Sequence, residues 1–511
     1  MSRTGRVLAA VSLGYVHLAL STLFGLWFTP FLLRRVGEGD FGLWAAGMPI
    51  LTYVGMVDFG VLTIFQRDVA FALGEARGDP RRIAALPTIV GKTLRLVLLQ
   101  MPALLAGIAI AWLLLPRGWS ALHVPLAISL GCVALMFPLR IYHALLVGLQ
   151  DLRFLGILTI VTWSMASVAS ALFVLDGWRL NALAVSWSLS QLVTYGACLY
   201  RARARLPAAV SVSLPAISRV DAVETLRKGF WVTVSQVAVM LSGGADLLVI
   251  AGVLGPSAVT PYTITDKLLT MVNNLPLMIA AAAQPALSEL STHRTGERLQ
   301  EVCLALTRAV LLVGGLLATV VVVVDQGFVA WWVGTHEFGG RTLLLVLVAD
   351  MLVTHWLVAI AYSLFAFGYE RVISLTGLFS SLAVVGASVV LVRHFGSMGA
   401  PLASVLVRAS ISLPVLLLAS ARATGGTVRG LLYSVFPWAW RLSLVMAAGV
   451  LAGRSWVPRT IPALSAAGAA AVLVYALVMW PLAVSEPLGK YTRPRFAVFR
   501  QRLARVGGAF R

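Results

Sequence analysis

Charged residues are scarce in this chain. Of its 511 residues, only 12% are Asp, Glu, Lys or Arg, whereas 59% are hydrophobic and the mean hydropathy is +0.90. A typical soluble domain carries about 25% charged residues, so this composition excludes a soluble globular protein of ordinary type. It predicts a polytopic, all-α membrane protein, in which apolar segments of about 20 residues cross the bilayer as helices.

Cysteines and catalytic motifs are also few. Cys132, Cys198 and Cys303 lie far apart in or beside apolar segments and form no CxxC pair, so a disulfide framework is not expected. The sequence holds no P-loop, no GxSxG motif and no cluster of histidines and carboxylates with metal-ligand spacing. We therefore expect no enzyme activity, no metal and no cofactor. Asp151 and Glu370 stand in short turns, where solvated charges are the default interpretation.

Acidic residues are outnumbered two to one: 40 Lys and Arg face 20 Asp and Glu, which gives a formal net charge of +20. A strongly basic chain can indicate nucleic-acid binding. Here the basic residues lie in short loops between apolar segments and not in a basic domain with interleaved aromatics, so we expect no nucleic-acid partner. Most of them fall in alternate loops and near both ends of the chain, which predicts that both termini are cytoplasmic.

Fourteen membrane spans are predicted from the apolar segments. They are residues 8–33, 41–65, 96–115, 123–148, 154–176, 181–200, 229–253, 261–287, 309–325, 342–368, 372–392, 400–421, 442–458 and 460–484. The expected organisation is an N-terminal lobe of six helices, a cytoplasmic linker, a C-terminal lobe of six helices, two further helices and a basic cytoplasmic tail. These parts cover residues 1–200, 201–228, 229–421, 422–484 and 485–511.

A weak internal repeat supports the division into two similar lobes. The turn VGEGDFGLW from Val36 has a fainter copy, LGPSAVTPY, that starts 218 positions later at Leu254. A second pair, GLQDLR from Gly148 and GYER from Gly368, agrees at nearly the same spacing. Because six spans are an even number, both lobes should have one orientation, related by a pseudo-twofold axis along the membrane normal.

Ionisable residues inside the predicted spans are candidates for a functional path, because each costs about 2.5–3.5 kcal/mol to insert at the bilayer centre. We expect them to line a polar cavity in which the cations bind an anionic cargo and the carboxylates take part in ion coupling. The cationic candidates are Arg34, Arg35, Arg140, Lys267 and Arg408, and the acidic ones are Asp58, Asp246, Asp266 and Asp350.

Most of these residues also have a structural interpretation. Arg140 is near the cytoplasmic end of its span and could extend to the interface. Asp266 and Lys267 could form a local polar pair, and Arg34 and Arg35 could anchor a helix end. The acidic residues Asp58 and Asp246 could satisfy backbone or hydroxyl groups of neighbouring helices; these alternatives stay open at the level of the sequence.

Several stretches together resemble one known family. The run RRVGEGDFGLW, followed by MVDFG and QRDVA, then ADLLVIAGVLGPSAVTPYTITDKL and PALSEL, is similar to the polysaccharide biosynthesis/export family. These are Wzx-type lipid-linked oligosaccharide flippases of the multidrug/oligosaccharidyl-lipid/polysaccharide exporter superfamily. The resemblance covers essentially the whole chain. Its Asp-x-Gly motif matches Asp58-Phe59-Gly60, and its acidic residue in the seventh helix matches Asp246, although Leu247 stands where family members often have Arg or Lys.

The resemblance implies a V-shaped cavity between two six-helix lobes, with two further helices attached alongside. It implies transfer of an undecaprenyl-pyrophosphate-linked oligosaccharide, such as an O-antigen or exopolysaccharide repeat unit, from the cytoplasmic to the periplasmic leaflet of a bacterial inner membrane. An ion gradient or the membrane potential would drive this alternating-access cycle. Membrane lipids, a polysaccharide polymerase and a chain-length regulator are the implied partners.

Two other functions remain open on the sequence alone. An ion-coupled multidrug antiporter of the same superfamily would need acidic residues to dominate the cavity, whereas basic candidates are at least as numerous here. An integral-membrane glycan polymerase or ligase would need a sizeable external loop, and every predicted external loop is short.

Overall fold

The computed structural model describes residues 3–75, 86–210, 214–215, 219–293 and 296–490. Helices make up nearly all of this part of the chain, and no strand occurs in it. Within the same residues, ten helical segments are long and apolar enough to cross a membrane. The all-α membrane fold is thereby confirmed, whereas the count of fourteen spans stays a prediction. The tail beyond Lys490 and part of the linker lie outside the described residues.

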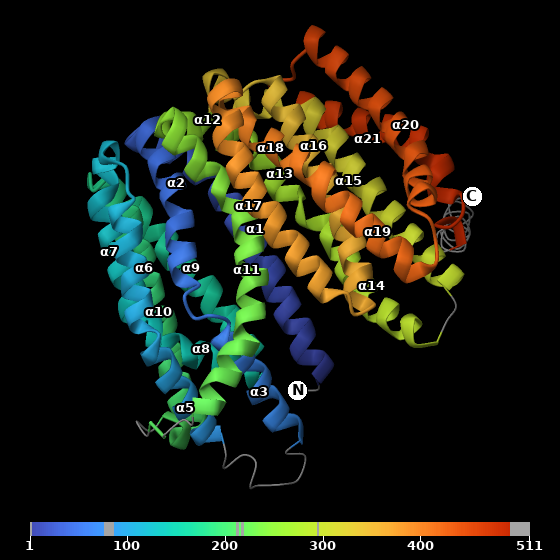
Figure 1. Ribbon diagram of the computed structural model, residues 1–511. Coiled ribbons are helices and arrows are strands. Elements are labelled where there is room, and N and C mark those ends of the chain that lie inside the picture. The colour runs from blue at the N-terminus through green and yellow to red at the C-terminus, as the bar shows by residue number, and fades with distance from the viewer. Residues whose placement is uncertain (1–2, 76–85, 211–213, 216–218, 294–295, 491–511) are drawn as a thin grey trace, which may run out of the picture. The chain divides into compact units, whose positions relative to one another are not determined.

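The first of two compact units comprises residues Met1–Thr260 (Figure 1). In it, α10 packs against α7 and α9, α1 packs against α9, and α2 packs against α7 and α11. The helices of this unit are α1 (Arg3–Val36), α2 (Glu38–Gly55), α3 (Val61–Glu75), α5 (Leu86–Leu99), α6 (Met101–Leu113), α7 (Ser120–Met136), α8 (Arg140–Gly148), α9 (Leu152–Leu175), α10 (Leu180–Arg205) and α11 (Arg219–Leu254). Short 3₁₀ turns join some of them: η1 (Arg117–Trp119), η2 (Phe137–Leu139), η3 (Pro207–Val210) and η4 (Pro256–Ala258).

The second unit comprises residues Pro261–Arg511. Its helices are α12 (Val259–Thr265, which contains the boundary), α13 (Lys267–Val272), α14 (Asn274–His293), α15 (Gly296–Trp332), α16 (Arg341–Ala366), α17 (Glu370–Phe395), α18 (Gly399–Val407), α19 (Leu413–Thr424), α20 (Val428–Ser455) and α21 (Ile461–Val484). The turns η5 (Thr335–Glu337) and η6 (Gly396–Met398) are 3₁₀ helices, and η7 (Arg408–Ser412) is a π-helical segment between α18 and α19.

The last two helices pack against α15 and against each other (Figure 1, red). Trp438 of α20 and Tyr475 of α21 belong to a buried cluster with Leu311 of α15. The Tyr475 hydroxyl donates a hydrogen bond of 2.7 Å to the carbonyl of Leu312. A side chain at Gly315 would meet both aromatic residues, since its Cβ would lie 2.6 Å from the Tyr475 oxygen. A glycine in α15 therefore lets the two C-terminal helices attach closely.

The contact pattern divides the chain at Thr260, whereas the sequence predicted the division at the linker 201–228. The difference lies in α11, which packs against α2 and α3 in the first unit. Gly229 permits this packing, because a Cβ there would lie 2.2 Å from the carbonyl oxygen of Phe59. The assignment of this helix to a C-terminal lobe stays a prediction about the internal repeat.

Several spans predicted as continuous are interrupted. The expected helix 41–65 divides into α2 and α3 at residues 56–60, and the expected helix 123–148 changes to a 3₁₀ turn at Phe137–Leu139, where Pro138 removes a backbone donor. In the second unit, 261–287 becomes three helices and 400–421 contains the π-helical segment. Apolar length alone does not reveal such breaks, because most residues on both sides of each break are hydrophobic.

Matching backbone conformations mark the internal repeat. Gly37 (φ 92°, ψ 160°) caps α2, and Gly255 (φ 97°, ψ 160°) caps η4 at the corresponding place 218 residues later. At the end of α8, the amide of Gln150 bonds to the carbonyl three residues back and that of Asp151 to the carbonyl five back. Gly368 and Tyr369 repeat this pattern at the end of α16. The second sequence pair therefore aligns Gln150 with Gly368, which is also a spacing of 218.

Candidate functional site

A cavity of about 730 Å³ lies within the first unit. Its lining comes from α2, α3, α7, α8, α10 and α11 together with the segment between α2 and α3. Asp58 and Arg140, which the sequence singles out for different roles, both line this cavity. The structure therefore brings an acidic and a cationic candidate to one place.

Asp58 lies where the second span is broken. Phe59 has a positive φ of 46° and Gly60 one of 68°, so the chain cannot continue as a helix there. The Oδ1 atom of Asp58 accepts a hydrogen bond of 3.1 Å from the Gly60 amide, and its carbonyl accepts from the amide of Val61, the first residue of α3. Asp58 thus satisfies donors at the start of α3, where the helix dipole also favours a negative charge.

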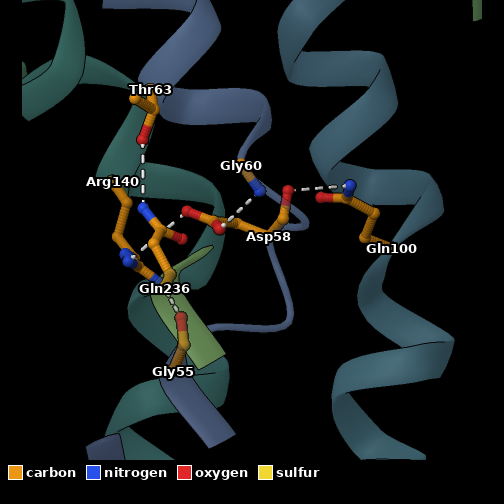
Figure 2. Close-up of polar contacts among 7 residues, drawn as sticks. All are labelled: Gly55, Asp58, Gly60, Thr63, Gln100, Arg140 and Gln236. Atoms are coloured by element: carbon orange, nitrogen blue, oxygen red, sulfur yellow. Dashed lines mark hydrogen bonds and ion pairs between the residues drawn. The ribbon is translucent and has the colours of Figure 1, made fainter. Parts of the chain in front are cut away.

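Gln100 satisfies the backbone of this break from a neighbouring span. Its side-chain nitrogen donates a hydrogen bond of 3.1 Å to the carbonyl of Asp58 (Figure 2). Gln100 itself stands between α5 and α6, where Pro102 begins the second of these helices. An unwound segment in a membrane needs such partners, because hydrocarbon offers none to a free carbonyl.

Arg140 is the first residue of α8, directly after the turn that Pro138 causes. One of its terminal nitrogens donates to the carbonyl of Gly55, the last residue of α2, and the other lies 3.6 Å from Oδ2 of Asp58 (Figure 2). A cation is favourable at the C-terminal end of a helix, as at α2 here. In these contacts the Arg140 guanidinium points to the broken span.

Arg140 keeps hydrogen-bonding capacity towards the cavity. Its side chain is 27% exposed, whereas that of Asp58 is 9% exposed. A guanidinium has five N–H donors, of which these contacts use only part. Asp58 is occupied by Gly60 and Arg140, so an added polar group would meet the arginine donors more readily than the carboxylate.

Uncharged polar and aromatic residues complete the lining. Gln66, Gln191 and Gln236 contribute amides, and Trp187 and Tyr195 contribute aromatic surfaces. The amide of Gln236 on α11 donates a hydrogen bond of 3.4 Å to the Thr63 hydroxyl on α3 (Figure 2). Amides and hydroxyls both donate and accept hydrogen bonds, which suits a ligand rich in hydroxyl groups.

A second ion pair lies in the second unit. Arg408, at the start of η7, donates hydrogen bonds of 2.6 Å to Oδ1 of Asp350 and to the Thr354 hydroxyl, both on α16. The Arg408 side chain is 11% exposed and that of Asp350 is 22% exposed. The structure thereby joins two further candidates from the sequence, one cationic and one acidic.

The other predicted residues occupy different positions. Arg34 and Arg35 are exposed in the last turn of α1. Asp246 lies on α11 in the same unit and interacts electrostatically with Tyr53 of α2. Asp266 and Lys267 stand at the junction of α12 and α13 in the second unit and interact with each other, as expected for a local polar pair. The transport roles assigned to all nine residues stay predictions.

Two features of the site were not predicted. Gln100 was overlooked because it is uncharged and because a break at that point was not expected. Arg140 and His143 on α8, and Trp187, Gln191 and Tyr195 on α10, recur at spacings of three or four residues. Such spacing places side chains on one face of a helix, so it could have indicated a polar lining in the sequence.

The solvated interpretation of Asp151 is wrong. This residue is 8% exposed and pairs with Arg201 at 2.9 Å and Arg205 at 3.3 Å, both in the last turns of α10. The guanidinium of Arg201 also lies 5.1 Å from the ring centroid of Phe154. The short turn between α8 and α9 is therefore tied to the end of α10.

Solved structures share this fold. A multidrug resistance MATE family transporter of the MOP superfamily, in an inward-facing conformation, matches with a TM-score of 0.61 and 15% identity, covering 79% of this chain and 95% of that one. The lipid II flippase MurJ, in an inward closed conformation, matches with a TM-score of 0.63 and 10% identity, covering 92% and 99%. An outward-facing MATE transporter gives a TM-score of 0.51 at 16% identity, with 82% and 94% covered.

The family of this chain is shown by comparison of its sequence with models of known families. No curated protein matches this chain significantly. The model of the polysaccharide biosynthesis protein family, however, matches residues 11–291, which is more than half of the 511 residues and includes the whole lining of the cavity. The resemblance noted in the sequence is thereby confirmed: the chain belongs to the polysaccharide biosynthesis protein family and has the fold of MOP superfamily transporters.

Proposed function

We propose that this protein moves an undecaprenyl-pyrophosphate-linked oligosaccharide from the cytoplasmic to the periplasmic leaflet of a bacterial inner membrane. The single observation that carries the proposal is the cavity in the first unit, where Arg140 offers unused donors beside amide and aromatic side chains. The arginine suits an anionic pyrophosphate, and the amides suit the sugar hydroxyls. Membership of the polysaccharide biosynthesis family supports this class of cargo.

Movement of such a cargo requires a polar site within the membrane but no bond cleavage. The headgroup and sugars need hydrogen-bonding partners away from water, while the isoprenoid tail remains in the hydrocarbon. The break between α2 and α3 provides backbone and carboxylate groups at the cavity wall without leaving them unpaired. Discontinuous helices of this kind are a recurrent device at transporter binding sites.

The runner-up function is an ion-coupled multidrug antiporter, which the fold would also allow. A cationic drug would need a free carboxylate in the cavity. The carboxylate of Asp58 instead accepts from Gly60 and faces Arg140, so it has little remaining capacity to bind a cation. The geometry therefore favours an anionic, hydroxyl-rich cargo over a cationic one.

In the cell, both termini would be cytoplasmic, and the translocated repeat unit would pass to a polysaccharide polymerase and its chain-length regulator. These partners follow from the class of cargo proposed.

The test is transfer in proteoliposomes of an undecaprenyl-pyrophosphate-linked oligosaccharide, detected by the access of an added glycosidase. Wild type should move the glycolipid, and Arg140→Gln should reduce the rate by at least about tenfold, since a charge-assisted hydrogen bond contributes about 1.5–3 kcal/mol. Arg179→Gln is the matched control, because Arg179 pairs with Asp40 at an exposed loop. Equal rates for wild type and Arg140→Gln, or efflux of cationic dyes without glycolipid transfer, would refute the proposal.

A further inference from the structure

Asp325 is a fully buried acid that the proposed function leaves without a role. It lies on α15 in the second unit, within a segment apolar enough to cross the membrane, and its exposed fraction is 0%. Neither of its carboxylate oxygens has a hydrogen-bond partner among the described residues. Buried acids are normally paired or hydrogen-bonded, so an orphaned one calls for an explanation.

The neighbours of Asp325 on α15 are engaged elsewhere. Gln326 accepts a hydrogen bond of 2.8 Å from Arg341 of α16, and Gly327 packs so closely that a Cβ would lie 1.9 Å from the carbonyl oxygen of Pro458. This part of α15 is therefore held firmly on two sides. The burial of Asp325 thus comes from close packing around this part of α15.

In the part of the chain that the structure describes, no counter-ion is found beside Asp325. The charged group that interacts with Asp325 is Asp266, a second acid at the junction of α12 and α13. The two carboxylates repel each other when both are ionised. Lys267, the residue after Asp266, interacts with that acid instead. Arg341 bonds to Gln326 and to the carbonyl of Gly453.

On α16, Asp350 pairs with Arg408 and His355 bonds to Asn273. Among the described residues, the remaining elements packed against α15 bring no cation into contact with Asp325 either. The other neighbours of α15 are α14, α19, α20, α21 and η5. The segment α21 carries no charged residue, and neither do the described side chains of α14. The charged groups on the others are Arg422 of α19, Arg429, Arg441 and Arg454 of α20, and His336 and Glu337 of η5, which lie 3.5 Å apart. None of these groups forms a hydrogen bond or ion pair with Asp325.

Two states could relieve a buried, unpaired carboxylate: the neutral acid or a bound metal cation. A sodium or divalent cation needs several oxygen ligands. Among the described residues, no group of three or more histidine, cysteine or carboxylate ligand atoms includes Asp325. One proton, in contrast, neutralises the group without further ligands. A proton therefore demands less of this structure than a metal cation does.

We propose that Asp325, together with Asp266, forms a proton-binding site that couples transport to the proton gradient. A proton from water adds to one Oδ atom of Asp325 to give the neutral acid, and its later release restores the carboxylate. Because two nearby carboxylates resist simultaneous ionisation, the charge on the half-buried Asp266 controls whether Asp325 keeps its proton. This inference rests on the proposed function for the cargo, but the site and its residues are separate from the cavity of the first unit.

The first measurement is infrared spectroscopy of the protein in bilayers, in which a protonated carboxyl group gives its own carbonyl band. Wild type should show this band near neutral pH, and Asp325→Asn should lose it. Asp176→Asn is the matched control, because Asp176 is an exposed carboxylate that accepts a hydrogen bond from Trp178. A band that persists in Asp325→Asn, or is absent from wild type, would overturn the assignment.

The second measurement separates this inference from the proposed function. In proteoliposomes, an imposed pH gradient should accelerate glycolipid transfer by wild type, and Asp325→Asn should lose this acceleration while Asp325→Glu retains part of it. Transfer that is independent of the pH gradient, or that responds to a sodium gradient instead, would overturn proton coupling and leave the flippase standing. Proton uptake that depends on Asp325 but occurs without glycolipid transfer would support the proton-binding site and refute the proposal that the glycolipid is the cargo.

Discussion

The two arginine–carboxylate pairs differ in how completely each is satisfied. In the first unit, Arg140 lies 3.6 Å from Asp58 and gives its closest hydrogen bond to the end of α2. In the second unit, Arg408 lies 2.6 Å from Asp350 and also bonds to Thr354. The Arg140 side chain is 27% exposed and that of Arg408 is 11% exposed.

This difference indicates different tasks. An arginine that is largely buried, close to its carboxylate and bonded to a further hydroxyl has few donors left, so the pair suits the fixing of two helices to each other. A longer pair beside a cavity keeps donors for a ligand. The π-helical segment at Arg408 aims the guanidinium at α16, whereas the 3₁₀ turn at Phe137–Leu139 places Arg140 at the cavity wall. In both units, therefore, a local helix irregularity places an arginine, in one unit at the cavity wall and in the other against α16.

The largest expected effect on stability comes from breaking the closer pair. Arg408→Met leaves the half-buried Asp350 without its counter-ion and should lower the free energy of unfolding by about 3 kcal/mol. Thermal unfolding of the purified protein in nanodiscs measures this loss. The double variant Arg408→Met/Asp350→Leu should recover most of it. A single variant as stable as wild type would show that the pair does not fix α16 to η7.

Arg140→Met should have a smaller effect on stability and a larger one on transport. Asp58 keeps its hydrogen bond from the Gly60 amide when the arginine is removed, so we expect a loss of about 1–2 kcal/mol in the same unfolding measurement. A loss in stability as great as that of Arg408→Met, with transport unchanged, would reverse the roles given to the two pairs.

Two hydrogen bonds made by uncharged side chains, those of Gln100 and Thr354, sharpen the comparison. Gln100→Leu removes the donor to the Asp58 carbonyl, and Thr354→Val removes an acceptor from Arg408; each should cost about 1 kcal/mol of stability. The first variant should also slow glycolipid transfer, since it loosens the break at the cavity wall. The second should leave the transfer rate near that of wild type. Slower transfer by Thr354→Val, with unchanged transfer by Gln100→Leu, would contradict the assignment of the binding site to the first unit.

The smallest effect is expected at the exposed pair Arg179–Asp40. The Arg179 side chain is 67% exposed, and solvated ion pairs contribute about 0–1 kcal/mol. Arg179→Ala should therefore change the unfolding midpoint little and leave transfer intact. A marked loss of stability would mean that this loop contact, between α2 and the start of α10, has a structural role comparable to the buried pairs.

The sequence revealed the class of the fold and most of the charged residues of the site, because apolar length and charge inside a span are strong signals. It also indicated the repeat, since glycines with positive φ, such as Gly37 and Gly255, leave a trace in the chain. It did not reveal which charged residues form ion pairs. The pairing of Asp58 with Arg140 depends on breaks in two spans, and each break is set by turns and by packing between distant segments.

Asp325 illustrates a second limit of the sequence. It was assigned to the end of an apolar span, where an acid can reach water, whereas α15 continues to Trp332 and buries it. Asp151 was misjudged in the same way, because the arginines that neutralise it lie 50 residues further along the chain or more. Burial of a single acid depends on what packs over it, and this information is not local.

The helix end at Gln150 has a consequence for protein engineering. Its hydrogen-bond pattern repeats at Gly368, yet the first copy holds an exposed glutamine at a φ of 56° where the second holds glycine. A left-handed conformation costs a residue with a side chain about 1–2 kcal/mol, and glycine is spared this cost. One half of the chain thus serves as a template for improving the other, and Gln150→Gly is a first substitution for making the protein robust enough to purify.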